Sequence, residues 1–241
     1  IMGIFTVSLT SVIYPSLSKL LVDKNEEGFV NIVTKSINLV TIFIVPVSAG
    51  AIILAKPIVR MLFERGMFDS NATQMTALAL VGYSIGMIAY SLRDILGKIF
   101  YALKDTKTPM INGIIAVVLN IVMDVYFSKI FGYGGLTLAT SISSIICIIT
   151  LFISLYKKAG YFGQDKIFST LIKSLISSVI MSLVVLFIYN NLVNLINITI
   201  INLAISIAVG GIVYLGLMYI LKVDELNMIL EIAIKYKEKI I

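Results

Sequence analysis

Long runs without a single charged residue divide this chain, and they constrain its fold more than any other feature. Four such runs cover residues 36–55, 70–92, 130–156 and 174–221. A helix of about 20 apolar residues crosses the hydrocarbon core of a bilayer, and each run is long enough for that. With 59% hydrophobic residues, 13% charged residues and a mean hydropathy of +1.03, the chain does not have the composition of a soluble domain. The expected fold class is all-α, a polytopic helical membrane protein.

The charged residues and turn signals divide these runs into six complete transmembrane helices. An apolar stretch over 1–13 is too short to span, so we expect it to be the second half of a truncated helix, followed by a polar loop over 15–31. Residues 56–69 alternate charge with bulky apolar side chains, which predicts a short helix at the membrane surface. The last segment, 223–241, is predicted to be an amphipathic helix on the cytoplasmic surface. The six expected spans are 33–55, 70–101, 109–126, 136–156, 168–189 and 198–221.

The basic residues fall mainly on one side of this zigzag. Of the 19 lysines and arginines, only Lys56, Arg60, Arg65 and Lys129 lie on the other side. Because basic loops stay in the cytoplasm, the rich side is predicted to be cytoplasmic, and the chain to end inside the cell. The net charge of +6 arises at span ends, where lysines bind lipid headgroups, so no nucleic acid is expected as a partner.

Several kinds of chemistry lack the residues that they need. The sequence has no histidine, no phosphate-binding glycine loop followed by Lys-Ser/Thr, and a single cysteine, Cys147, inside an apolar span. We therefore expect no catalytic residues, no cofactor and no metal site beyond a monovalent cation.

One polar cluster is predicted within the spans. Asn120 and Asp124 stand one helical turn apart near the outer end of the third span, and Thr140 enters the fourth span just after a glycine-rich turn. At about 1.5 Å rise per residue the three reach similar depths, giving one carboxylate and two neutral oxygen ligands. An ionisable residue within a span is a functional candidate, so we predict a cation or proton site. The alternative is that Asp124 only reaches the interface or pairs with Lys129.

A second candidate site lies at the inner end of the second span. Arg93 and Lys98 could bind a substrate phosphate there, although Asp94 and Lys98 also have the spacing of an ordinary helical ion pair. In the same span, Gly82 and Gly86 are predicted to allow close packing of a neighbouring helix.

Three stretches in order along the chain carry a family resemblance. They are Leu62-Phe63-Glu64-Arg65-Gly66-x-Phe68, then Phe100-Tyr101-Ala102-Leu103-Lys104-Asp105-Thr106-Lys107-Thr108-Pro109, and then Gly135-Leu136-x-Leu138-Ala139-Thr140-Ser141. With Pro15-Ser16-Leu17-Ser18, they resemble the MurJ/MviN lipid II flippase family, over residues 10 to 160. That family belongs to the multidrug/oligosaccharide-lipid/polysaccharide exporter superfamily. Beyond residue 160 the likeness rests on hydropathy.

The resemblance implies a carboxyl-terminal fragment of an alternating-access flippase in the bacterial inner membrane. Residues 1–160 would form a partial MATE-like carboxyl-terminal lobe, and 161–222 two extra helices with a groove for a lipid tail. Residues 223–241 would form the surface helix. The implied partners are lipid II or a similar polyprenyl-pyrophosphate-linked saccharide, membrane lipids, and the missing amino-terminal lobe, whose arginines would hold the pyrophosphate. Coupling to Na+ or H+ is expected.

Three alternatives stay open at this point. A related oligosaccharide-lipid flippase or a cation-coupled multidrug exporter would share the same fold. An integral-membrane enzyme acting on polyprenyl phosphates would need clustered acids or a histidine centre, whereas the acids here are scattered. A membrane scaffold without transport activity would have no use for polar residues such as Asn120 and Asp124 inside a span.

Overall fold

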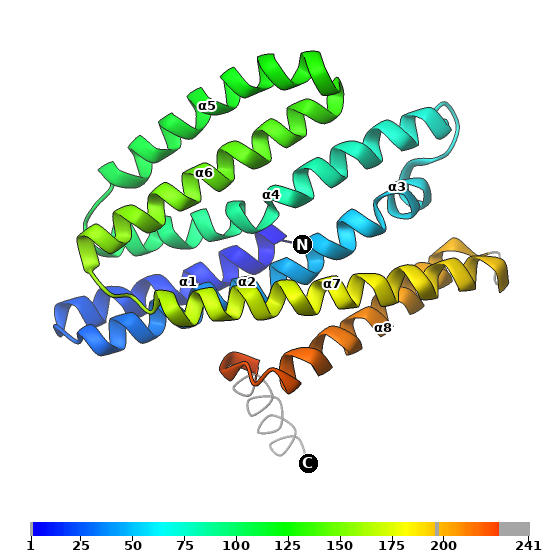
Figure 1. Ribbon diagram of the computed structural model, residues 1–241. Helices are drawn as coiled ribbons and strands as arrows, with labels where there is room; N and C mark the ends of the chain where they lie inside the picture. Colours follow the sequence, from blue (N-terminus) through cyan, green and yellow to red (C-terminus); the bar gives the residue numbers. More distant parts are fainter. Residues whose placement is uncertain (1, 196–197, 227–241) are drawn as a thin grey trace.

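A computed structural model describes residues 2–195 and 198–226, and every regular element in that part is a helix. Figure 1 shows the α5–α6 hairpin at one edge of the molecule and the α7–α8 hairpin at the other, with α1, α2 and α4 between them. The eight helices are α1 Met2–Val22, α2 Glu26–Ile53, α3 Ala55–Phe63, α4 Ser70–Ala102, α5 Lys107–Phe131, α6 Tyr133–Ala159, α7 Gln164–Leu195 and α8 Thr199–Ile220.

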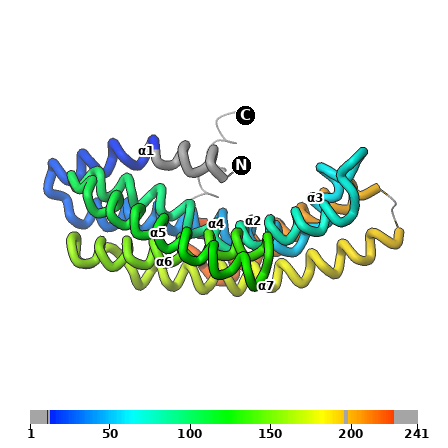
Figure 2. The backbone as a smooth tube through the Cα atoms, turned by 90° about the horizontal axis from the view of Figure 1, so that it is seen from above, coloured from blue at the N-terminus to red at the C-terminus, as the bar shows by residue number. Residues whose placement is uncertain are grey.

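Six of these helices, α2 and α4 to α8, are long and apolar enough to cross a membrane. This confirms the six predicted spans, and the short helix predicted after the first span is found as α3. Figure 2 shows α3 at the opposite end of the molecule from the turn between α1 and α2. Most spans extend beyond their predicted ends because polar residues such as Gln164 and Lys107 join their first turns. Hydropathy marks where a helix enters the bilayer, whereas the backbone hydrogen bonds continue into water.

The prediction of a polar loop over residues 15–31 is wrong. Helix α1 continues through Pro15 to Val22, and only Asp23, Lys24 and Asn25 separate it from α2. A proline removes one backbone donor but does not always end a helix. The side-chain oxygen of Asn25 then accepts a hydrogen bond from the Gly28 N–H, which starts α2.

The close approach of α4 and α6 depends on small residues, as predicted for Gly82 and Gly86. A Cβ added at Gly82 would lie 1.9 Å from Thr137 Oγ1, and one added at Gly86 would lie 2.8 Å from the Ser141 Cα. The Ser141 hydroxyl donates to the Gly82 carbonyl at 2.6 Å. Because lipid offers no hydrophobic drive for helix association, such contacts and hydrogen bonds hold the spans together.

The α5–α6 hairpin is equally tight at its turn. Gly132 has a φ of +59°, in the left-handed region that favours glycine, and a Cβ at Gly135 would lie 2.2 Å from the Phe127 carbonyl oxygen. Helix α5 packs along α6 but touches α4 only slightly. Most side chains of α5 are therefore left uncovered by the other helices.

The predicted amphipathic helix over 223–241 lies mostly outside the described residues, which end at 226. Within the described part, Asp224 is exposed, but Glu225 is only 9% exposed. Asp224, Glu225 and Leu226 are helical, so a helix begins at the two predicted acids, and its place on the membrane surface stays a prediction. Glu225 accepts a hydrogen bond from Asn38, which is 187 positions away in the chain. No local sequence pattern indicates this contact.

Candidate functional site

The structure brings together the three residues of the predicted polar cluster. Asn120 and Asp124 extend from α5, and Thr140 extends from α6, all half-buried. The Asn120 amide nitrogen donates to Asp124 Oδ1 at 3.4 Å and to Thr140 Oγ1 at 3.3 Å. Both distances are long for hydrogen bonds, so the Asn120 amide links the carboxylate and the hydroxyl only weakly.

The charge of Asp124 has no ion-pair partner in the described part of the chain, where Lys129 makes no salt bridge. The alternative of an Asp124–Lys129 pair is therefore not what the structure shows. The Thr140 hydroxyl donates to the Leu136 carbonyl at 2.8 Å, which leaves its lone pairs directed toward Asn120. Rotation of the Asn120 amide would add a third oxygen beside the carboxylate and the hydroxyl.

The second candidate site is a cleft of about 660 Å³ between α4 and α5, and it contains both predicted basic residues. The Lys98 ammonium lies 5.7 Å from the centre of the Tyr101 ring, and the predicted Asp94–Lys98 pair is absent among the described residues. The cleft also includes the first turn of α5, where the helix dipole adds positive potential. Its lining residues are Arg93, Asp94, Gly97, Lys98, Tyr101, Pro109, Met110, Gly113, Ile114, Val117 and Val118.

An apolar groove of about 870 Å³ runs between α6 and α7, which diverge from their connecting turn in Figure 1. Helices α2 and α4 form its floor, and nearly all of its lining atoms are carbon, with Ser48, Ser178 and Ser182 as the polar exceptions. Leu92 lines the groove, whereas Arg93, its neighbour in sequence, lines the basic cleft. The groove takes Ile85, Ile88, Ala89 and Leu92 from α4, and the cleft takes Arg93, Asp94, Gly97, Lys98 and Tyr101. At 3.6 residues per turn these two sets face opposite sides of α4.

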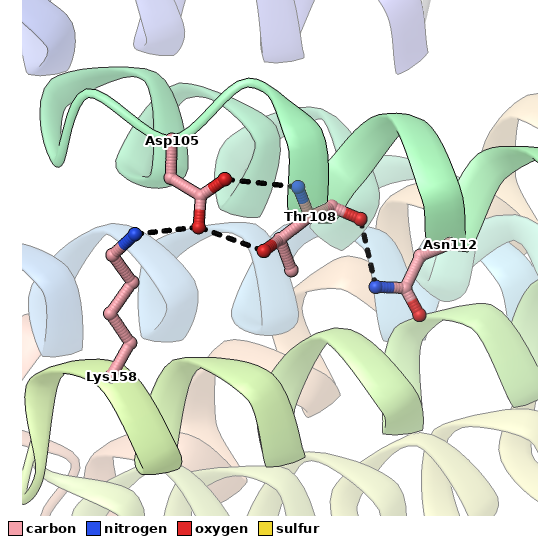
Figure 3. A network of polar contacts seen from close by, with 4 residues as sticks. All are labelled: Asp105, Thr108, Asn112 and Lys158. Carbon is pink, nitrogen blue, oxygen red and sulfur yellow. Dashed lines mark hydrogen bonds and ion pairs between the residues drawn. The ribbon is translucent and has the colours of Figure 1, made fainter.

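A polar cross-link that the sequence did not predict fixes the loop between α4 and α5 (Figure 3). Asp105 accepts hydrogen bonds from the Thr108 amide at 3.0 Å and the Thr108 hydroxyl at 2.8 Å. Its carboxylate also pairs with Lys158 of α6 at 2.6 Å. The Lys158 ammonium and both Thr108 donors hold the pKa of the Asp105 carboxyl well below its usual range.

Asp105 followed three residues later by Thr108 is a helix-start pattern that could have been found in the sequence. The partner Lys158 lies 53 positions further along, beyond the reach of local patterns. The cross-link ties the first turn of α5, at the edge of the basic cleft, to α6.

Six helices long and apolar enough to span a membrane, with a polar cluster around one carboxylate and a basic cleft, define a polytopic membrane protein. The family model for the lipid II flippase MurJ matches residues 1–207. The chain therefore belongs to the MurJ lipid II flippase family, a family of transporters and not of enzymes.

Individual relatives support this assignment. A probable lipid II flippase MurJ of Vibrio cholerae is 36% identical over 160 residues, which are 66% of this chain and 30% of that protein. One from Buchnera aphidicola subsp. Acyrthosiphon pisum is 31% identical over 230 residues, 93% of this chain and 45% of the relative. A solved lipid II flippase MurJ in an inward closed conformation has a TM-score of 0.73 at 29% identity, covering 91% of this chain and 43% of its own. The chain thus spans less than half the length of these relatives.

The Asp105 cross-link predicts a specific dependence of stability on pH. Because the folded-state pKa of Asp105 is lowered, its stabilisation is complete above the unfolded value near 4 and is lost as pH falls through the folded value. In detergent, Tm of the wild type should fall more steeply below about pH 5 than Tm of Asp105→Asn. Asp165→Asn, at an exposed carboxylate without an ion pair in the described residues, is the control. Parallel pH curves for wild type and Asp105→Asn would contradict the assignment.

Proposed function

We propose that this chain is part of a flippase that moves lipid II, or a closely similar polyprenyl-pyrophosphate-linked saccharide, from the inner to the outer leaflet by alternating access. The observation that carries this proposal is a TM-score of 0.73 to a solved lipid II flippase over 91% of the chain. The basic cleft and the apolar groove on the same fold supply the two kinds of surface that such a lipid needs.

The cluster of Asn120, Asp124 and Thr140 would couple transport to Na+ or H+. A carboxylate with neutral oxygen partners suits a weakly held monovalent cation, which must leave in every cycle, better than a divalent one. The absence of an ion pair to Asp124 among the described residues supports this role, because its charge is then free for an ion. The half-buried position lowers the local dielectric and strengthens the attraction.

Asp124→Asn should reduce flipping at least tenfold in the whole protein while membrane insertion stays intact, because the only charged ligand of the cluster is lost. The measurement is lipid II flipping in proteoliposomes at several sodium concentrations and pH values. The matched control is Lys129→Gln, which removes the nearest basic residue on α5 without touching the cluster. Normal flipping by Asp124→Asn, with unchanged dependence on sodium and pH, would make Asp124 a structural residue.

The two ends of the lipid would use different surfaces. Arg93 and Lys98 would bind phosphate oxygens of the headgroup, since arginine and lysine form strong charge-assisted hydrogen bonds with phosphate. The groove between α6 and α7 would hold part of the polyprenyl chain, since its walls are almost entirely hydrocarbon. Because the cleft and the groove lie on opposite sides of α4, each contribution needs its own test.

Binding of farnesyl pyrophosphate and of a long-chain polyprenyl pyrophosphate to the whole protein separates the two ends. The double variant Arg93→Gln/Lys98→Gln should weaken the binding of both ligands about tenfold or more, because both ligands carry the pyrophosphate. Val179→Trp, which fills the groove from an exposed position, should weaken the binding of the long-chain ligand only.

The matched controls are Lys104→Gln, in the loop outside the cleft, and Val122→Trp, at a similarly exposed position of α5. If Val179→Trp weakened the binding of both ligands equally, the groove would not be the binding site of the polyprenyl chain. No loss in the double cleft variant would remove Arg93 and Lys98 from the headgroup site.

The location would be the bacterial cytoplasmic membrane, with the chain ending inside the cell. The distribution of basic residues, concentrated at one end of the spans, supports this orientation. A cysteine in place of Lys104 should resist an impermeant thiol reagent in intact cells, whereas one in place of Asn194 should react. Both positions are exposed, so burial does not explain a difference. Labelling at Lys104 and protection at Asn194 would reverse the orientation.

A further inference from the structure

The chain turns back sharply where α8 ends. Lys222 has a φ of +50°, and its N–H donates to the Tyr219 carbonyl at 3.0 Å, while the Val223 N–H donates to the Met218 carbonyl at 3.3 Å. This is the hydrogen-bond pattern of a Schellman motif, which ends a helix and redirects the chain. The redirected residues enter an apolar cluster, where Val223 is 2% and Leu226 is 5% exposed.

A carboxylate enters the protein with them. Glu225 lies between these apolar residues, and its Oε1 accepts a hydrogen bond of 2.6 Å from the Asn38 amide on α2. Asn38 is itself only 1% exposed. A buried acid is strongly unfavourable unless a donor compensates it, so this contact is required for the segment to pack where it does.

Helix α8 has few other attachments to the rest of the bundle. It packs on α7 and touches α2 and α3 only lightly. One polar contact with α2 is made by Tyr214, whose hydroxyl donates to the Ile42 carbonyl at 2.8 Å. Asn38 and Ile42 are four residues apart and therefore lie on the same face of α2. Tyr214 and Glu225 thus form hydrogen bonds with adjacent turns of this helix.

We propose that Glu225 is a positioning residue that fixes the segment after α8 to α2 and thereby holds the end of α8 against that helix. The contact with Asn38 carries this role, and the net charge of Glu225 is not required for it. The test therefore has to separate the hydrogen bond from the charge.

The variant Glu225→Gln separates the effect of the hydrogen bond from the effect of the charge. The Asn38 Oδ1 is buried and has no hydrogen-bond partner among the described residues. In Glu225→Gln the new amide would keep an oxygen for Asn38 Nδ2 and offer an N–H to Asn38 Oδ1. This variant should hold the segment at least as firmly as the wild type, whereas Glu225→Ala should release it.

The measurement is the labelling rate of Leu226→Cys by a permeant thiol reagent, in the whole protein with its native cysteines, Cys147 included, replaced by serine. Glu225→Ala should label about tenfold faster or more, since the hydrogen bond to Asn38 is lost and its buried amide is left without an acceptor. Asp224→Ala removes the same charge one position earlier, at an exposed side chain, and should leave the rate unchanged. A rate for Glu225→Ala equal to that of Asp224→Ala would overturn the proposal, as would fast labelling of Glu225→Gln.

A second measurement needs no cysteine and no transport, so its failure is distinct from failure of the proposed flippase activity. Trypsin cleavage after the exposed Lys222 requires the following segment to detach. Asn38→Leu should be cleaved faster than Asn38→Leu/Glu225→Leu, because the single variant leaves a buried carboxylate without a donor. Equal cleavage of the two variants, or slower cleavage of the single one, would contradict the pairing.

Discussion

The close contact between α4 and α6 determines where the remaining parts of the structure can lie. In a bilayer, helices gain little by burying apolar surface, so shape and internal hydrogen bonds decide which faces meet. Gly82 and Gly86 let Thr137 and Ser141 approach α4 directly, and the Ser141 hydroxyl binds the Gly82 carbonyl. Thr140, the residue before Ser141, is thereby turned toward α5. The position of the polar cluster follows from a contact made on the neighbouring face of α6.

Much of this arrangement could be predicted from the sequence, because membrane solvation leaves clear local signals. The six spans follow from uncharged runs, and the meeting of Asn120, Asp124 and Thr140 follows from helical rise and a tight glycine turn. The basic cleft was also indicated by Arg93 and Lys98 at a span end. In each case the contact partners lie on consecutive helices or within one helix.

The parts that were missed depend on contacts between distant segments or on the tolerance of a helix for an unfavourable residue. Asp105 meets Lys158 across 53 positions, and Asn38 meets Glu225 across 187. Nothing near Glu225 distinguishes it from Asp224, yet one acid is buried and the other is exposed. The continuation of α1 through Pro15 was missed because proline lowers helix stability without specifying where the chain must turn.

Helix α5 contributes residues to both candidate sites. Asp124 lies toward one end of this 25-residue helix, and Pro109 and Met110, at the other end, line the basic cleft. The helix is fastened along α6, by the Gly132 turn at one end and the Asp105–Lys158 pair at the other, and is nearly free of α4. At about 1.5 Å per residue this helix is about 37 Å long, so both candidate sites lie along one continuous element. If the two sites act as proposed, a cation at the cluster and an anion at the cleft would both alter how this one helix packs against α6.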